Sequence, residues 1–192
     1  MEGWWAASYI VLWLLVVVLA VIVVALARQI GTLHLRLGPR GALEMDDEGP
    51  PLQEAPPAFD LTDLSGRSVT VGGPGTSQFL LFVSPGCRLC EEVLPSLGAV
   101  AQTGEMWPLV ISDSDSQETK RAYAEHKNDA PIVPAPAVAQ SYSVPGTPYA
   151  VILDDLGVVR AKGAVNNLEQ MEGLVDTARR RLAGVGRERK VG

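Results

Sequence analysis

The first stretch of this chain is apolar over a length that crosses a lipid bilayer. No charged residue stands between Gly3 and Ala27, and residues 9–27 are almost all aliphatic. A bilayer core takes about 20 apolar residues in helical form, so residues 9–27 predict a transmembrane helix. Residues 1–8 precede it and contain Trp4. Because tryptophan favours the membrane–water boundary, we interpret residues 1–8 as an interfacial segment.

A cleaved signal peptide is the alternative interpretation of this stretch. Ala25-Leu26-Ala27 resembles the small-x-small pattern of a cleavage site, whereas an acidic start at Glu2 is atypical of a signal peptide. The arginines after the span are Arg28, Arg36 and Arg40. For an uncleaved single-pass anchor, the positive-inside rule would place that side in the cytoplasm. Under both interpretations the segment indicates membrane targeting or export.

Residues 28–56 predict a juxtamembrane segment and then a linker. Acidic residues and prolines alternate in its second half, which is typical of solvated, extended chain. We therefore expect the folded domain at 57–182 and a flexible basic tail at 183–192. The formal net charge of −6 offers no basic footprint for nucleic acid.

From residue 57 onward, strand patterns alternate with helical ones. The strand patterns lie at 59–71 (two short strands), 79–83, 107–111, 149–153 and 158–163. The helical patterns lie at 91–101, 116–126, 137–142 and 167–182. Pro95 is expected to kink the first of these helices. The alternation, which ends in a hairpin and a helix, predicts an α/β sandwich with a mixed central sheet flanked by helices.

The chain has two cysteines, Cys87 and Cys90, between the apolar run 79–83 and the next predicted helix. A disulfide that closes so small a loop stabilises a fold by only about 2 kcal/mol, which favours reactive chemistry over a structural role. At a helix N-terminus, unpaired N–H groups and the helix dipole would favour a Cys87 thiolate. Two alternatives stay open: an inert buried pair, and half of a metal site, for which His34 and His126 are the histidines present.

Four features together resemble the thioredoxin superfamily, over about residues 57–181. They are the strand followed by Cys-x-x-Cys and a helix, Pro95 shortly after Cys90, Gly146-Thr147-Pro148 before a strand, and the closing hairpin and helix. The strands at 59–71 resemble the redoxin, or TlpA-like, branch. The resemblance implies a thioredoxin-like fold and a redox-active Cys87–Cys90 disulfide.

Within this branch, residues 28–43 and 82–87 are similar to the MauD family of membrane-anchored accessory proteins of methylamine dehydrogenase. The similarity implies an enzyme without cofactor or metal, a thiol–disulfide oxidoreductase on the extracytoplasmic, or periplasmic, side of the cell membrane. Its partners would be an exported protein client with thiols, such as the methylamine dehydrogenase small subunit, and a redox partner in the membrane. It would form or isomerise disulfides in that client. This location disagrees with the positive-inside rule.

The resemblance also assigns roles around the dithiol. Cys87 would exchange with the client through a mixed disulfide, which Cys90 would resolve. Pro148 would be a cis-proline facing Cys87, so that the Thr147 backbone can pair with a client strand. The expected substrate-binding residues are Gly86, Arg88, Thr147 and Pro148.

Two positions depart from the thioredoxin pattern. Leu81 stands where thioredoxins carry a buried Asp, and Gly86 stands where a Trp is frequent. A proton relay to the buried thiol is therefore missing or supplied elsewhere. The other functions considered are a thiol-based reductase, a thiol peroxidase in which Ser84 precedes Cys87, a metal- or haem-assembly chaperone that binds through the thiols, and a non-catalytic adaptor.

Overall fold

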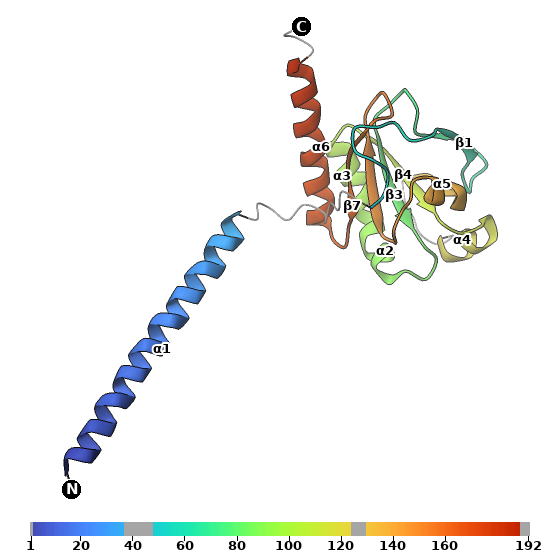
Figure 1. Cartoon of the computed structure of the whole chain (residues 1–192). Helices are drawn as coiled ribbons and strands as arrows, with labels where there is room; N and C mark the ends of the chain where they lie inside the picture. Colours follow the sequence, from blue (N-terminus) through green and yellow to red (C-terminus); the bar gives the residue numbers. More distant parts are fainter. Residues whose placement is uncertain (1, 37–47, 124–129, 189–192) are drawn as a thin grey trace. The chain divides into compact units, whose positions relative to one another are not determined.

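The computed structural model describes residues 2–36, 48–123 and 130–188 (Figure 1). The chain divides into two compact units, Met1–Pro39 and Arg40–Gly192. The first unit consists of one helix, α1 (Glu2–Arg36), and all the assigned strands belong to the second. The α/β domain therefore has a core of its own, separate from the N-terminal helix.

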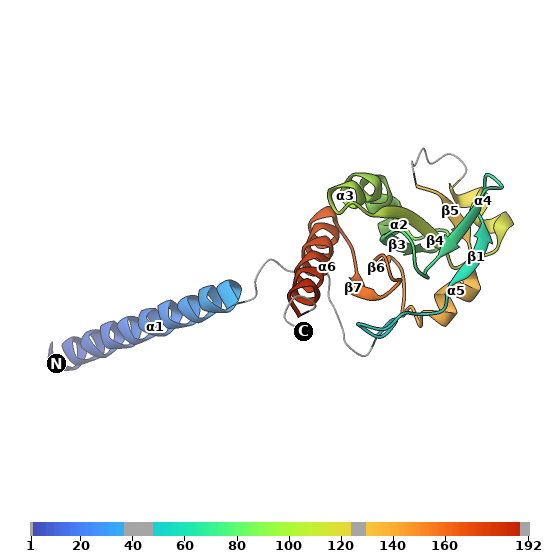
Figure 2. The ribbon, with the colours of Figure 1, turned by 90° about the horizontal axis from the view of Figure 1, so that it is seen from above.

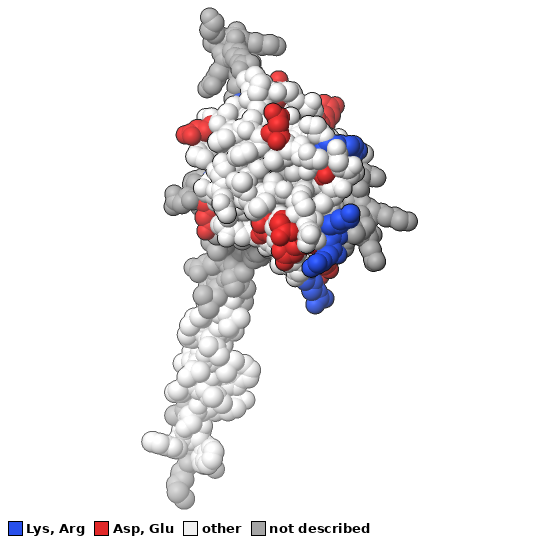
Figure 3. All heavy atoms as spheres, turned by 90° about the vertical axis from the view of Figure 1, so that its right-hand side faces the viewer, with Lys and Arg blue, Asp and Glu red and all other residues white. Residues whose placement is uncertain are grey.

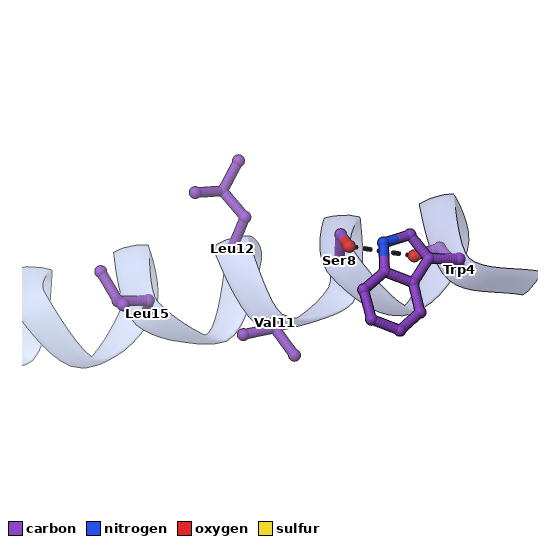
Figure 4. A pocket seen from close by; sticks show the side chains of 5 residues that line it. All are labelled: Trp4, Ser8, Val11, Leu12 and Leu15. Carbon is purple, nitrogen blue, oxygen red and sulfur yellow. Dashed lines mark hydrogen bonds between the residues drawn. The ribbon is translucent and has the colours of Figure 1, made fainter.

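Helix α1 extends beyond the predicted span 9–27 at both ends. Its segment Gly3–Val23 is long and apolar enough to cross a membrane, and a signal sequence near an N-terminus has the same character. The side chains of Trp4, Ser8, Val11, Leu12 and Leu15 line a shallow apolar groove on this helix (Figure 4). The Ser8 hydroxyl donates a hydrogen bond to the Trp4 carbonyl at 2.9 Å, so this polar group is satisfied within the helix, as an apolar surrounding requires.

The domain is built on a five-stranded sheet with the order β5-β4-β3-β6-β7. Its strands are β3 (Gln78–Val83), β4 (Trp107–Ser112), β5 (Ile132–Pro134), β6 (Tyr149–Leu153) and β7 (Val159–Ala164). Strands β3, β4 and β5 are parallel, whereas β6 and β7 run antiparallel to their neighbours. Every residue of β3 is buried, as its continuous apolar run predicted for a central strand. The expected mixed sheet is confirmed.

Two layers cover this sheet (Figures 1 and 2). One contains α2 (Arg88–Val93), α3 (Leu97–Thr103) and α6 (Leu168–Glu188), and the other contains α5 (Pro136–Ser141) and the hairpin of β1 (Phe59–Thr62) and β2 (Ser68–Val71). Side chains of β3 alternate between the layers: Leu81 packs in the cluster of α2, α3 and α6, whereas Phe82 packs against Tyr142 of the other layer.

Several predicted elements differ from those observed. The prediction of a single helix at 91–101 is wrong. The first helix begins earlier, at Arg88, because Cys87 caps it. A 3₁₀ turn at Leu94–Ser96, which contains Pro95, separates α2 from α3. Strand β5 was not predicted. Helix α6 continues to Glu188, so residues 183–188 are helical rather than a tail, and 189–192 lie outside the described residues.

The helix predicted at 116–126 is α4 (Ser116–Tyr123). Its expected end at His126 lies outside the described residues. Asp115 begins the helix, since its side chain accepts hydrogen bonds from the backbone N–H groups of Gln117 and Glu118 at 2.8 and 2.9 Å.

The end of the predicted linker is not free chain but packs on the domain. The Gln53 N–H donates to the Val159 carbonyl at 3.0 Å, and the Val159 N–H donates to the Glu54 carbonyl at 2.9 Å. The Tyr149 hydroxyl donates to the Glu48 carbonyl at 3.0 Å. Residues 48–54, which we call the edge strap, are thus held at Val159 of the last strand and at Tyr149 of β6, and they satisfy the Val159 backbone groups that an open edge would expose. Residues 37–47 lie outside the described residues.

The face of the domain in Figure 3 is mainly uncharged, with small separate groups of acidic and basic side chains. One internal ion pair joins Arg160 and Asp154, both buried, at 2.7 Å. Asp154 also accepts hydrogen bonds from the backbone N–H groups of Leu156 and Val158, so the carboxylate in the β6–β7 turn is satisfied.

Candidate active site

The turn from β3 into α2 presents the two cysteines. After Val83 the chain turns through Ser84 and Gly86, and the Cys87 N–H donates to the Ser84 carbonyl at 3.2 Å. Gly86 has φ +75°, a conformation that side chains disfavour. This backbone accounts for a glycine at the position where thioredoxins frequently carry Trp.

Cys87 is the N-cap of α2 and is joined to Cys90 by a disulfide, with the two Cα atoms 5.2 Å apart. The Cys87 sulfur accepts a hydrogen bond from the Cys90 N–H at 3.2 Å. Cys90 is fully buried, whereas Cys87 is half-buried. A partner molecule can therefore reach the Cys87 sulfur before that of Cys90.

The loop before β6 lies against Cys87. Tyr149 begins β6 opposite Phe82 of β3, which brings the preceding loop to the end of β3 where the cysteines follow. The Thr147–Pro148 peptide bond is cis, as the resemblance implied. The Thr147 carbonyl oxygen is 3.8 Å from the Cys87 sulfur. The Thr147 carbonyl is thus beside the disulfide, and the peptide bond that follows it to Pro148 has the predicted cis form.

Arg88, the remaining predicted site residue, extends into solvent. Its side chain is 90% exposed and lies 3.4 Å from the Glu92 carboxylate. An exposed pair of this kind contributes little to stability, so the side chain is free to rearrange around a partner.

Three polar residues that meet near the cis-proline loop were not predicted as a group from the sequence: Ser84, Asp113 and Tyr123. The Ser84 hydroxyl donates to Asp113 and accepts from the Thr147 hydroxyl at 2.8 Å, and the Tyr123 hydroxyl donates to the Ser84 carbonyl at 2.7 Å. Ser84 and Asp113 directly follow the parallel strands β3 and β4. Two polar residues at the carboxyl ends of neighbouring parallel strands were the one sequence feature from which this group could have been predicted.

Tyr123 is a neutral hydrogen-bond donor at physiological pH. Burial, together with the negative charges of Glu91 and Asp113, raises the pKa of Tyr123 to about 12. Leu81, by contrast, is fully buried in the same apolar cluster as Cys90. An apolar side chain therefore occupies the position at which thioredoxins carry a buried Asp.

No known family model matches the chain. The chain is 36% identical over 183 residues to the methylamine utilization protein MauD of Methylorubrum extorquens, covering 93% of this chain and 89% of that protein. It is 37% identical over 182 residues to MauD of Methylobacillus flagellatus, covering 93% and 88%. With MauD of Paracoccus denitrificans it shares 33% identity over 189 residues, 96% of this chain and 94% of the relative.

Solved structures share the fold. The thioredoxin domain of a thiol-disulfide oxidoreductase from Bacteroides vulgatus superimposes with a TM-score of 0.54 at 21% identity, covering 66% of this chain and 97% of that domain. An exposed lipoprotein thioredoxin of Streptococcus pneumoniae gives a TM-score of 0.54 at 19% identity, covering 65% and 99%. The fold is that of thiol–disulfide oxidoreductases of the thioredoxin type. Because the identity to three MauD proteins extends over nearly their whole length, this chain belongs to the MauD family of methylamine utilization proteins.

Proposed function

We propose that this protein is a membrane-anchored thiol–disulfide oxidoreductase that uses the Cys87–Cys90 pair to form or isomerise disulfides in an exported client. The observation that carries the proposal is the contrast in burial between the two sulfurs beside the cis-proline loop. Cys87 is accessible, Cys90 is fully enclosed, and Thr147 approaches Cys87 to 3.8 Å. One sulfur is thus available for exchange and the other for intramolecular attack.

The exchange proceeds in two balanced steps. A client thiolate attacks the Cys87 sulfur, the bond to Cys90 breaks, and Cys90 leaves as a thiolate that takes up a proton. A second client thiolate then attacks the client sulfur of the mixed disulfide and displaces Cys87. The client gains one disulfide, and the Cys87–Cys90 pair gains the two electrons and ends as a dithiol.

The site offers a client three kinds of contact. The Thr147 backbone, whose carbonyl lies 3.8 Å from the Cys87 sulfur, would pair with an extended client segment. Gly86, without a side chain, and exposed Leu89 leave an open, partly apolar surface around the half-buried sulfur. Arg88 adds a cationic side chain that an acidic client residue can approach.

We infer that the cellular role is maturation of methylamine dehydrogenase, with its small subunit as the client. The family membership supports a role in methylamine utilization. The apolar segment Gly3–Val23 supports a membrane anchor, with the domain on the extracytoplasmic side, where disulfides persist.

The test uses the full chain in detergent micelles, incubated with the small subunit in its disulfide-bonded form, so that a Cys87 thiolate can attack a client disulfide and displace a client thiolate. Cys90→Ser keeps the accessible sulfur and removes the resolving one, so it should accumulate a mixed disulfide with the client. Cys87→Ser is the matched control and should form none. Equal trapping by the two variants, or by neither, would refute the assignment of roles.

The direction of electron flow follows from the reduction potential of the full chain against glutathione. An oxidant or isomerase lies near about −120 to −180 mV, and a reductase of the thioredoxin kind near about −270 mV. We expect the first range. A value near the second would replace the oxidative role with that of a thiol-based reductase supplied with electrons from the membrane.

A further inference from the structure

A line of three polar side chains runs beside the disulfide from the cis-proline loop to the end of β4. The Thr147 hydroxyl donates to the Ser84 hydroxyl at 2.8 Å, and the Ser84 hydroxyl donates to a carboxylate oxygen of Asp113. An ionised carboxylate only accepts, so the direction of both hydrogen bonds is fixed by Asp113. The three residues come from three separate parts of the chain, which makes this line a property of the fold.

Ser84 is the centre of this arrangement. Its hydroxyl binds Thr147 and Asp113, and its carbonyl accepts from the Cys87 N–H at 3.2 Å and from the Tyr123 hydroxyl at 2.7 Å. One residue therefore holds both the backbone of the accessible cysteine and the loop whose carbonyl faces that cysteine's sulfur.

Asp113 is held in turn by groups around it. Its N–H donates to the Val83 carbonyl at 3.0 Å, and its second carboxylate oxygen accepts from the Ser114 hydroxyl at 3.2 Å. The titratable groups near it are Tyr123 of α4, which remains protonated, and Glu91 in the first turn of α2, which acts on the same tyrosine. Asp113 is thus linked through the Ser84 and Thr147 hydroxyls to the residue whose carbonyl lies 3.8 Å from the Cys87 sulfur.

We propose that Ser84 and Asp113 are positioning residues that hold the Thr147 carbonyl against the Cys87 sulfur and thereby lower the reduction potential of the Cys87–Cys90 pair. This inference rests on the proposed exchange function of the pair. In the oxidised protein the sulfur carries no charge, and the carbonyl at 3.8 Å is a neutral contact. When the disulfide is reduced, the partly negative carbonyl oxygen and the Asp113 charge both disfavour a Cys87 thiolate.

The sign of the effect follows from this difference between the two redox states. At a pH at which reduced Cys87 is ionised, groups that disfavour the thiolate destabilise the reduced form and leave the disulfide unaffected, so they make the pair a weaker oxidant. Removal of the Asp113 charge or of the Ser84 hydroxyl should stabilise the reduced form. The potential of the pair should then become less negative.

The test compares the full chain in detergent with Asp113→Asn and Ser84→Ala, with Asp115→Asn as the matched control. Asp115 is a nearby exposed carboxylate whose hydrogen bonds go to the start of α4, so its loss removes a charge without touching Thr147. We expect both test variants to shift the equilibrium constant with glutathione about tenfold toward the reduced form, equivalent to about 30 mV, and the control to shift it less than about twofold.

A second readout separates positioning from a general loss of structure. The rate at which reduced Cys87 is alkylated should rise at pH 6 in Asp113→Asn, because the thiolate becomes more populated, while Asp115→Asn matches the natural protein. If Asp113→Asn does not fold, Thr147→Val replaces it, because it removes the hydroxyl at the other end of the line. We expect Thr147→Val to raise the potential and the alkylation rate in the same way.

The outcomes separate this inference from the proposed function. If the natural protein exchanges disulfides but its potential is unchanged in Asp113→Asn, Ser84→Ala and Thr147→Val, the positioning role is refuted and the function stands. An equal shift in Asp115→Asn also refutes it, since the effect would then be one of net charge. A natural protein that does not exchange at all refutes the function as well.

Discussion

Replacement of Leu81 by aspartate tests whether the acid that thioredoxins carry can be restored in this core. Leu81 is fully buried in β3, between Val110 of β4 and Ala150 of β6, in the cluster that contains Cys90. Loss of the apolar side chain costs about 2–5 kcal/mol, as for a buried Leu→Ala change. A buried carboxyl group without a hydrogen-bond partner adds about 1–3 kcal/mol to the loss of stability even when it is neutral. The sum, about 3–8 kcal/mol, approaches the whole stability of a domain of this kind.

The pH dependence of Leu81→Asp gives a sharper expectation than its magnitude. Burial raises the pKa of a carboxyl, so the folded state would hold a proton that the unfolded state releases above about pH 4. Stability should therefore fall as pH rises above about 4, by up to about 1.4 kcal/mol per pH unit, until the raised pKa of the folded state is passed.

The assay is urea unfolding of the full chain in detergent at pH 5 and pH 7, followed by near-ultraviolet circular dichroism of the domain. Leu81→Asn is the control, because it has the same shape without a titratable group and should lose stability equally at both values. A Leu81→Asp variant that is as stable as the natural protein, or more stable at pH 7 than at pH 5, would refute this account of the core.

Two further changes test other parts of the domain. Gly49→Ala places a methyl group against the Tyr149 hydroxyl at a residue with φ +75°, so it should release the edge strap at a cost of about 1–2 kcal/mol in stability. Deuterium exchange at the Val159 amide should then accelerate. Unchanged protection of this amide would refute the role of the edge strap. Burial raises the pKa of Asp63, but hydrogen bonds from Ser65 and Arg67 outweigh this effect and lower the pKa to about 2. The ionised Asp63 therefore adds to the free energy of unfolding in full above about pH 4, and this contribution is lost as the pH falls toward 2. Asp63→Asn should cost about 1–2 kcal/mol at pH 7 and flatten this acid-side loss, and an unaltered urea midpoint at pH 7 would contradict it.

The central strands could be predicted because their apolar runs are unbroken. Burial on both faces of a sheet leaves that simple pattern, as in β3 and β6. Strand β5 is three residues long and ends in Pro134, so it carries too little pattern to be recognised. The edge strap was missed for a related reason: its pairing uses backbone groups, which the acidic and proline-rich sequence does not reveal.

The candidate site was predictable only where chemistry and local spacing coincide. Cys87, Cys90 and the Thr147–Pro148 segment could be identified from motifs. Asp113 could not, because its link to Ser84 depends on which strands are neighbours in the sheet, and the two residues are 29 positions apart in sequence. Contacts of this kind are set by topology, and no local pattern records them.

The edge strap also determines how far the dithiol can travel. Because residues 48–54 are held on the domain and α1 ends at Arg36, only the chain between these points separates them, and its full extension is about 40 Å. In the anchored form that we propose, the helical residues after Val23 and this chain together would limit the distance between the lipid and the Cys87 sulfur, so the dithiol would not sample the whole compartment. A client that emerges from the same membrane would meet it at a high effective concentration, whereas a client released into solution would not.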